Sequence, residues 1–277
     1  MQTTILQPPY PHAGTVAAAV DCQAWMVEQL QALEPGDSDL IVLPEYANVP
    51  GLGECDEVRS FAAGDGAGFI RKVTARAIEL HAAVTFSLAV EDGDHWYNRA
   101  VLHDADGALA AAYDKIHITD AEADPMGMSP GTSVVAAKWG SCTVAFAVCF
   151  DLYFAEYFAA LSALGVDLII CPSYQRSESA ERICLQCRAR ALDTGAWLVR
   201  GSYAMHREDS GGRSLAAAPD GSLPAVAGGE PEVLHVSFDP RQKFVKPASH
   251  GSAPVEHREL IESHRQDAVY RSVRSLR

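Results

Sequence analysis

The sequence predicts a single α+β domain in which two mostly β layers are covered by helices. Short apolar runs typical of buried strands alternate with helical patterns from one end of the chain to the other. The 277 residues are 48% hydrophobic and 21% charged, which is typical of a globular protein with a sizeable core. No linker, internal repeat or low-complexity tract divides the chain, so we expect one domain over residues 1–277.

The first half of the chain is expected to form a helix-covered sheet that ends in a hairpin. Apolar spacing and turn residues predict helices over 21–33 and 69–81, and strands over 39–43, 83–90, 97–103 and 108–113. The last two strands form a hairpin that delivers Lys115 to the edge of a site. The glycine-rich segment 64–68 lacks the Lys-Ser/Thr of a phosphate-binding loop, so we interpret it as a flexible loop.

The second half repeats the alternation of strands and helices. The predicted elements are a hairpin over 134–139 and 142–148, helices over 151–164 and 181–194, and strands over 166–171, 196–201, around Leu215 and over 232–238. Gly165 is expected to end the first of these helices, because glycine tolerates the left-handed conformation found there. Asp151 is expected to cap the same helix.

The charge distribution limits the partners of the chain. A formal net charge of −14 argues against nucleic acid and anionic membrane as partners, since both require a basic surface. Residues 241–277 nevertheless form a basic C-terminal arm, with eight Lys or Arg against four Asp or Glu. This arm is expected to dock on the acidic body or on a second subunit, or to form a solvated helix. No secretion signal and no membrane-spanning run is recognised, so a cytoplasmic location is expected.

Cysteine usage favours free thiols over disulfides. Seven cysteines are an odd number, and Cys142 and Cys171 lie in apolar runs typical of core residues. Cys184 and Cys187 form a C-x-x-C without a second pair, so we expect no metal site. The chain also lacks the G-x-S-x-G of serine hydrolases and the H-E-x-x-H of metallohydrolases.

Three chemically distinct side chains stand at the ends of apolar runs. Glu45 follows Ile41–Pro44, Lys115 follows the strand that ends at Tyr113, and Cys149 follows the run that begins at Cys142. A thiol nucleophile, a carboxylate base and a cation at strand ends are typical of acyl transfer at a carbon–nitrogen bond. The alternatives are a core cysteine, a loop carboxylate and a surface lysine.

With these motifs, the chain resembles the nitrilase superfamily of carbon–nitrogen hydrolases. The matching segments are Leu43–Glu45, Tyr113–His117 and Val148–Leu152, with spacings of 70 and 34 residues between the three candidate catalytic side chains. The resemblance implies a four-layer αββα sandwich, assembly as a homodimer or larger homo-oligomer, and chemistry without a cofactor.

The resemblance also implies a branch and a supporting carboxylate. Cys149-Phe150-Asp151 resembles the amidase branches, whereas true nitrilases usually follow the cysteine with Trp-Glu. Many amidase relatives carry an arginine where this chain has Tyr153. Many also carry a second glutamate after the lysine, a position that register assigns to Asp124, with Glu122 as the alternative.

The residue types and the resemblance together imply a role for each site residue. Cys149 would attack an amide carbonyl, Glu45 would transfer protons, and Lys115 with the backbone N–H of Phe150 would form the oxyanion hole. His117 is more simply interpreted as a structural histidine. Tyr174 and Arg176 are expected to line the pocket mouth, where Arg176 or Arg182 is a candidate to bind a substrate carboxylate.

The predicted function is hydrolysis of a small linear amide or N-carbamoyl compound with release of ammonia. Two alternatives stay open: a true nitrilase acting on a small nitrile, and a catalytically idle family member acting as a binding protein. The idle protein would be expected to lack one of the three catalytic groups, and all three are present.

Overall fold

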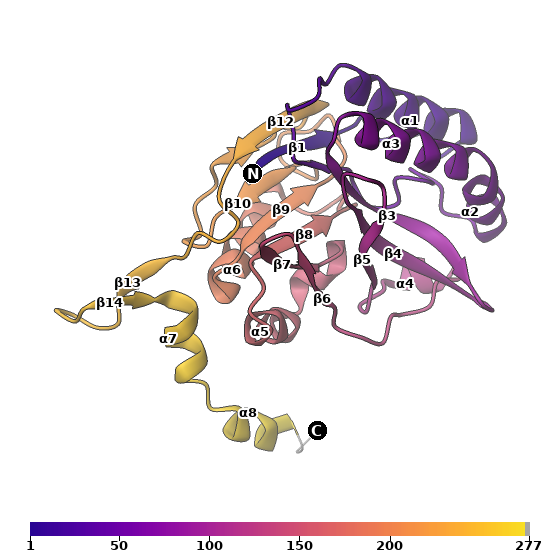
Figure 1. The fold of residues 1–277 in the computed structure, drawn as a ribbon. Coiled ribbons are helices and arrows are strands. Elements are labelled where there is room, and N and C mark those ends of the chain that lie inside the picture. Colours follow the sequence, from indigo (N-terminus) through magenta and orange to yellow (C-terminus); the bar gives the residue numbers. More distant parts are fainter. Residues whose placement is uncertain (275–277) are drawn as a thin grey trace.

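The computed structural model of the protein describes residues 1–274 and contains two six-stranded sheets (Figure 1). Their strand orders are β12-β1-β2-β3-β4-β5 and β11-β10-β9-β8-β7-β6. In chain order the elements are β1 (Gln2–Gln7), α1 (Val16–Gln31), β2 (Leu40–Val42), α2 (Cys55–Phe61), η1 (Ala62–Gly66), α3 (Ala67–Glu79), β3 (Ala83–Asp92), β4 (His95–His103), β5 (Leu109–Asp114), α4 (Asp120–Ala123), β6 (Ala136–Trp139), β7 (Cys142–Phe146), η2 (Cys149–Tyr153), α5 (Ala155–Ala163), β8 (Leu168–Pro172), α6 (Ala180–Thr194), β9 (Trp197–Gly201), β10 (Leu215–Ala217), β11 (Ala225–Val226), β12 (Glu232–Ser237), β13 (Val245–Pro247), β14 (Pro254–Glu256), α7 (His257–Ser263) and α8 (Asp267–Arg274).

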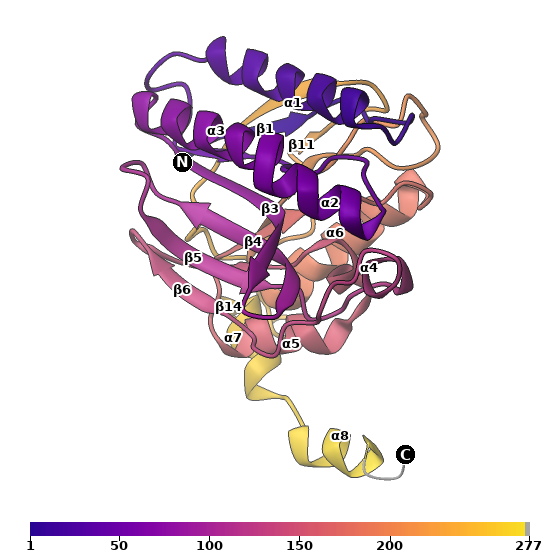
Figure 2. The same cartoon turned by 90° about the vertical axis from the view of Figure 1, so that its right-hand side faces the viewer.

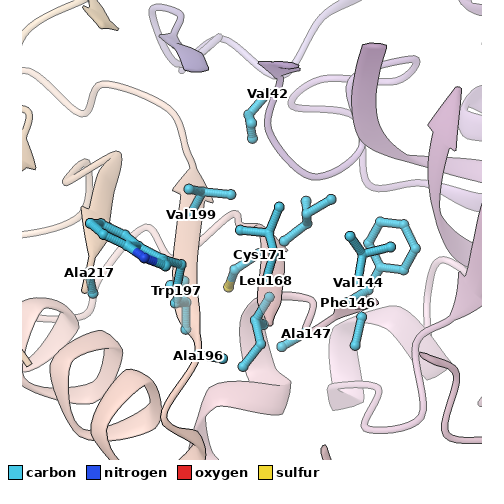
Figure 3. Packing of buried hydrophobic residues seen from close by; sticks show 14 of the residues in the cluster. Val42, Val144, Phe146, Ala147, Leu168, Cys171, Ala196, Trp197, Val199 and Ala217 are labelled. Carbon is cyan, nitrogen blue, oxygen red and sulfur yellow. The ribbon is translucent and has the colours of Figure 1, made fainter. Parts of the chain in front are cut away.

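The two sheets pack face to face through alternate side chains of their strands. Val42 of β2 points toward the second sheet, where Val144, Phe146 and Val199 belong to the same apolar cluster (Figure 3). Its neighbour Ile41 belongs to a different cluster, which lies on the other face of the first sheet. This alternation is the expected consequence of the two-residue period of a strand that is buried on both faces.

Helices cover the outer face of each sheet. Met26 of α1 and Val73 of α3 pack on the first sheet, and the two helices lie side by side above it (Figures 1 and 2). Phe158 of α5 and Ile183 of α6 pack on the second sheet. The layers therefore follow the order α-β-β-α, and the predicted four-layer sandwich in a single domain is confirmed.

Two sequence interpretations are corrected by the structure. The glycine-rich segment is helical: η1 is a π-helical turn that joins α2 to α3 without a loop. The predicted helix over 151–164 is divided into the 3-10 turn η2 and helix α5, and Phe154 rather than Asp151 precedes α5. Gly165 follows α5 with a positive φ of 67°, as predicted.

The basic arm begins as a short hairpin and a helix that dock on the body of the same chain. Arg258 of α7 is buried, and it donates hydrogen bonds to the carbonyl oxygens of Thr194 at 2.6 Å and of Gly195 at 3.0 Å. Lys243 forms an ion pair with Asp167 at 3.1 Å. Helix α8 extends beyond this docked part (Figures 1 and 2), and residues 275–277 lie outside the described residues. Assembly into a homo-oligomer stays a prediction.

Within residues 1–274, none of the helices combines the length and the apolar character that a membrane span requires.

Candidate active site

Glu45, Lys115 and Cys149 meet where strand ends of the two sheets come together. Glu45 follows β2 and Lys115 directly follows β5, both in the first sheet, whereas Cys149 follows β7 in the second sheet. Their exposed fractions are only 1%, 1% and 9%, respectively. All three side chains line one cavity. The prediction that distant segments bring these groups together is therefore confirmed as geometry.

The backbone is left-handed at Cys149 and directly after Glu45, the two residues whose side chains would exchange a proton. Cys149 has a φ of 48°, and Tyr46, directly after Glu45, has a φ of 55°. Non-glycine residues rarely adopt the left-handed region, and such conformations persist where the surroundings enforce them. The constraint turns the chain sharply just after β7 and places the Cys149 side chain at the cavity.

Asp151 fixes this turn as predicted, and it caps the 3-10 turn η2 rather than helix α5. Its buried carboxylate accepts hydrogen bonds from the backbone N–H of Val148 at 2.8 Å and from the Tyr113 hydroxyl at 2.9 Å. His117 Nδ1 lies 2.7 Å from the other carboxylate oxygen, and the His117 ring stacks on Phe154. Asp151 thus joins the cysteine turn to the segment that carries Lys115, and His117 has the structural contacts that were expected.

Lys115 lies between two buried carboxylates. Its Nζ is 2.9 Å from Glu45 Oε1 and 2.8 Å from each carboxylate oxygen of Glu122. Asn98 Nδ2 donates to the same two groups, at 2.7 Å to Glu45 and 2.9 Å to Glu122. A buried charge is tolerated only when it is paired, and the Lys115 ammonium is paired with a carboxylate on each side.

Glu122 is the carboxylate that reaches the site, so the register argument that favoured Asp124 is wrong about which side chain lies there. Asp124 is exposed, whereas Glu122 is 4% exposed and bound to Lys115. Glu122 is held by Thr119 in a reciprocal capping box at the start of α4, with the Thr119 N–H donating to Glu122 Oε2 at 2.8 Å. The sequence Thr119-Asp120-Ala121-Glu122 has the pattern of a capping box. The register argument did not take this pattern into account.

Burial and neighbouring charges shift the pKa values of Glu45, Lys115 and Glu122 in different directions. Burial raises the pKa of the Glu45 carboxyl; the Lys115 ammonium offsets part of this effect and the Glu122 carboxylate adds to it. Burial alone would lower the pKa of Lys115, but Glu45 and Glu122 outweigh burial and raise it. Burial opposes ionisation of Glu122, but Lys115 outweighs it and lowers the pKa of Glu122.

Cys149 is held as a neutral thiol. Burial, and after it the nearby Glu45 carboxylate, raise the pKa of Cys149 well above its ordinary value, and Lys115 offsets only part of this. A thiolate is therefore not stable in the resting site, and attack requires a base that removes the proton during the reaction. Glu45 is suited to that task because its carboxyl interacts with the Cys149 thiol, and its buried Oε2 is not engaged in a hydrogen bond of normal geometry with any other described residue.

The reacting groups line a small inner cavity of about 130 Å³. Val49, Leu52 and Met126 form part of its wall, so the space beside the polar groups is apolar. This volume is well below the ~300–1,000 Å³ of ordinary ligand pockets, and it favours a short substrate.

A second cavity of about 330 Å³ lies at the entrance and also contacts Cys149. Tyr174 and Arg176 line both cavities, as expected for residues at a pocket mouth. Phe150 lines the outer cavity, and the role of its backbone N–H in an oxyanion hole stays a prediction.

Comparison with known proteins places the chain in a family. The carbon–nitrogen hydrolase family profile matches residues 3–242. The chain belongs to the carbon–nitrogen hydrolase family. Omega-amidase NIT2 of Danio rerio is 27% identical over 212 residues, covering 72% of this chain and 76% of its own length. Omega-amidase NIT2-B of Xenopus laevis is 26% identical over 214 residues, covering 73% and 77%.

Solved structures agree with the fold. A cysteine-to-serine mutant of the Nesterenkonia AN1 amidase, from the nitrilase superfamily, matches with a TM-score of 0.69 and 20% sequence identity, covering 98% of this chain and 97% of that one. At this identity the likeness establishes the nitrilase-type sandwich. The predicted enzyme class, a thiol-dependent carbon–nitrogen hydrolase, is thus consistent with both family and fold.

Sequence reasoning missed several residues that hold the hydrolase site together. Tyr46 donates its hydroxyl proton to Glu122 Oε1 at 2.9 Å, and the Tyr203 hydroxyl donates to the carbonyl oxygen of Glu45 at 2.7 Å. Asn98 connects the carboxylates of Glu45 and Glu122. Tyr46 directly follows Glu45, but only the three-dimensional fold shows that its hydroxyl returns to the same cluster.

The correction concerning Glu122 gives a direct prediction. Glu122→Gln should lower kcat/KM for amide hydrolysis by about 10- to 100-fold, because a positioning interaction with a charged group is worth about 1.5–3 kcal/mol. Asp124→Asn is the matched control and should stay within about twofold of the parent, since its side chain is exposed. Steady-state kinetics on both variants checks this, and equal effects of the two substitutions would contradict the assignment.

Proposed function

We propose that the protein hydrolyses the carbon–nitrogen bond of a small linear amide through a thioester on Cys149 and releases ammonia. The observation that carries this proposal is the shared lining of one small cavity by a neutral thiol, an ammonium and a carboxylate with a free oxygen. The omega-amidase names of the relatives support an amide substrate.

In the first half-reaction the Cys149 sulfur attacks the amide carbon while its proton passes to Glu45 Oε2. The carbonyl oxygen becomes an oxyanion, which Lys115 Nζ and the backbone N–H of Phe150 stabilise; one well-placed donor of this kind is worth about 3 kcal/mol. Glu45 then gives the proton to the leaving nitrogen. The carbon–nitrogen bond breaks, ammonia departs, and the acyl group stays on sulfur as a thioester.

In the second half-reaction water takes the place of ammonia. Glu45 removes a proton from the water, whose oxygen attacks the thioester carbon. The carbon–sulfur bond breaks, the acid product leaves, and the proton on Glu45 returns to the Cys149 sulfur. Glu122 remains ionised throughout and acts as a positioning residue that keeps Lys115 charged and directed toward the cavity.

A substrate screen tests this function and its alternatives. Ammonia release should be measured for matched linear amides, N-carbamoyl amines and nitriles of the same chain length. We expect the amides to be hydrolysed fastest. A preference for the N-carbamoyl compounds would also release carbon dioxide and would revise the substrate class. A preference for nitriles would identify a nitrilase, and turnover of none of these would favour a binding protein.

The raised pKa of Glu45 gives a pH prediction. Glu45 must be a carboxylate to accept the thiol proton, so kcat/KM should fall as the pH decreases through its pKa. Because burial raises this pKa, the acid limb of the profile should lie above ~4.3, the value of an ordinary glutamate. A pH profile of kcat/KM with a single amide checks the sign; full activity down to the ordinary glutamate range would contradict the proposed base.

A further inference from the structure

Asn98 of β4 contacts three groups of the site at once. Its backbone carbonyl oxygen accepts a hydrogen bond from the Lys115 N–H at 2.9 Å. Its side-chain Nδ2 donates to Glu45 Oε1 at 2.7 Å and to Glu122 Oε1 at 2.9 Å. The residue is fully buried, and it lines neither of the two cavities that contact Cys149. Any effect of Asn98 on the reaction therefore passes through the groups that it holds.

The Asn98 amide makes the two oxygens of the Glu45 carboxylate different. Oε1 accepts hydrogen bonds from Asn98 Nδ2 and from Lys115 Nζ, at 2.7 Å and 2.9 Å. A carboxylate oxygen has two lone pairs, so both of those on Oε1 are occupied. Oε2 is buried and is not engaged in this way, while the carboxyl interacts with the Cys149 thiol. A proton that reaches Glu45 therefore binds at Oε2.

A neutral donor between the two carboxylates also suits their charges. Lys115 pairs with both Glu45 and Glu122, so the three groups together keep one negative charge in excess when both carboxyls are ionised. The Asn98 amide holds the two carboxylates side by side without adding a charge. A second cation in its place would weaken Glu45 as a base more than a neutral donor does, because a nearby positive charge lowers the pKa of a carboxyl group.

The other end of the Asn98 side chain shows that the amide is unfavourable for stability alone. Its Oδ1 is buried and has no hydrogen-bond partner among the described residues. A buried acceptor without a partner is costly, and an apolar side chain of the same shape would avoid that cost. The amide at this position is therefore explained by the two carboxylates that its Nδ2 binds.

We propose that Asn98 is a positioning residue for proton transfer, which occupies Glu45 Oε1 and leaves Oε2 as the atom that takes the proton from Cys149. This inference rests on the proposed function of Glu45 as the base, and it names the residue that determines which oxygen acts. As the sulfur attacks, its S–H bond breaks and the proton forms an O–H bond at Oε2. The same oxygen then gives the proton to the leaving nitrogen, so the selection applies to both transfers.

The effect of Asn98 on Glu45 should be visible in the pH profile. Burial raises the pKa of Glu45, Lys115 offsets part of this effect, Glu122 adds to it, and the hydrogen bond with Cys149 lowers it. Three tyrosine hydroxyls also face Glu45 and stay neutral because burial raises their pKa; they belong to Tyr46, Tyr174 and Tyr203. A donor to a carboxylate favours its ionised form, so removing the amide should raise the pKa of Glu45 and move the acid limb to higher pH.

Steady-state kinetics of Asn98→Leu tests the inference, because leucine replaces the amide with an apolar group of similar size. For a small linear amide, we expect kcat to fall about 10- to 100-fold and the acid limb of kcat/KM to move up by about one pH unit. KM should change less than about threefold, since Asn98 does not line the cavities. Asn98→Ala, measured in parallel, removes the same donors with a smaller side chain, so the result does not depend on how leucine packs.

A double-mutant comparison separates this role from a merely structural one. In the Glu45→Gln protein, Asn98→Leu should lower the remaining rate by less than about threefold, because the oxygen that Asn98 selects is no longer a base. A structural role would lower the rate by the same factor in both backgrounds. Gln7→Leu is the matched control: it removes another fully buried amide, one that donates to the carbonyl oxygens of Gly228 and Glu230. It should lower thermal stability and leave the acid limb in place.

Alkylation of Cys149 by chloroacetamide gives a second readout that needs no amide turnover. The sulfur bonds to the methylene carbon, chloride leaves, and the thiol proton passes to Glu45. The acid limb of this alkylation rate, followed by mass spectrometry, should move to higher pH in Asn98→Leu as well. An unmoved acid limb in both assays, or an equal loss of rate in both Glu45 backgrounds, would overturn the inference. If the wild-type protein releases no ammonia from any amide while the alkylation limb moves, the proposed function fails and the role of Asn98 stands.

Discussion

Replacing Cys149 with alanine should lower the rate of amide hydrolysis by on the order of 10⁴-fold or more, as removal of a covalent nucleophile does in other hydrolases. No other thiol lines the inner cavity among the described residues, so none can take over the attack. The fold should survive, because the change removes one sulfur atom at a cavity wall. We expect the loss in the free energy of unfolding to be below about 2 kcal/mol.

A second cysteine provides the control for this result. Cys184 is a half-buried thiol on α6, and Cys184→Ser should retain activity within about threefold. Ammonia release and thermal unfolding should be measured on both variants. Wild-type-like turnover by Cys149→Ala would remove Cys149 as the nucleophile.

Replacing Glu45 with glutamine should have the second largest effect, a loss of about 10²- to 10⁴-fold in kcat/KM, the usual contribution of general acid–base catalysis. Glutamine preserves the size of the side chain but cannot accept the thiol proton. Lys115 keeps its interaction with Glu122 in this variant, so the ammonium is not left unpaired and the fold is expected to be retained.

The matched control for Glu45→Gln is Glu79→Gln on α3, where the carboxylate is 64% exposed and forms a surface ion pair with Arg76. Surface ion pairs contribute little to stability, so this variant should resemble the parent in both activity and unfolding. The acid limb of the pH profile should be lost only in Glu45→Gln. An unchanged rate and acid limb in that variant would contradict the role of Glu45 as proton carrier.

The three candidate catalytic residues could be predicted because each follows a recognisable apolar run, and the structure brings the ends of those runs, from both sheets, to one cavity. Those apolar runs and the family motifs were sufficient to identify Glu45, Lys115 and Cys149 as candidates. The partners of these residues could not be predicted in the same way. Asn98 reaches the site from strand β4, and Tyr203 reaches it from the segment after β9. Local sequence patterns do not predict that these two side chains contact Glu45.

The glycine-rich turn after α2 shows why local composition can mislead. Glycines usually indicate a loop, but Gly66 ends a helical turn that packs on the segment following Glu45. A Cβ atom at Gly66 would lie 2.5 Å from the carbonyl oxygen of Asn48, so only glycine permits this close approach. The residue is therefore explained by packing of the helix near the site rather than by flexibility.

Strand β1 was missed because its sequence does not follow the usual apolar pattern. It pairs with β12 on one side and with β2 on the other, yet Thr3, Thr4 and Gln7 are buried beside Ile5 and Leu6. The Gln7 side chain is tolerated there because its Nε2 donates to the carbonyl oxygens of Gly228 and Glu230, each at 2.9 Å. Polar residues in a segment weaken the prediction of a buried strand from hydrophobic periodicity. Long-range hydrogen bonds such as these can nevertheless satisfy buried polar groups.

The central claim is that these groups form a thioester on Cys149, and mass spectrometry of the acid-quenched enzyme with a small linear amide tests it most directly. We expect the peptide that contains Cys149 to gain the mass of the acyl group, and we expect the gain to be absent from Cys149→Ala. Continued ammonia release with no acyl group on that peptide, or with the acyl group on another residue, would contradict the account.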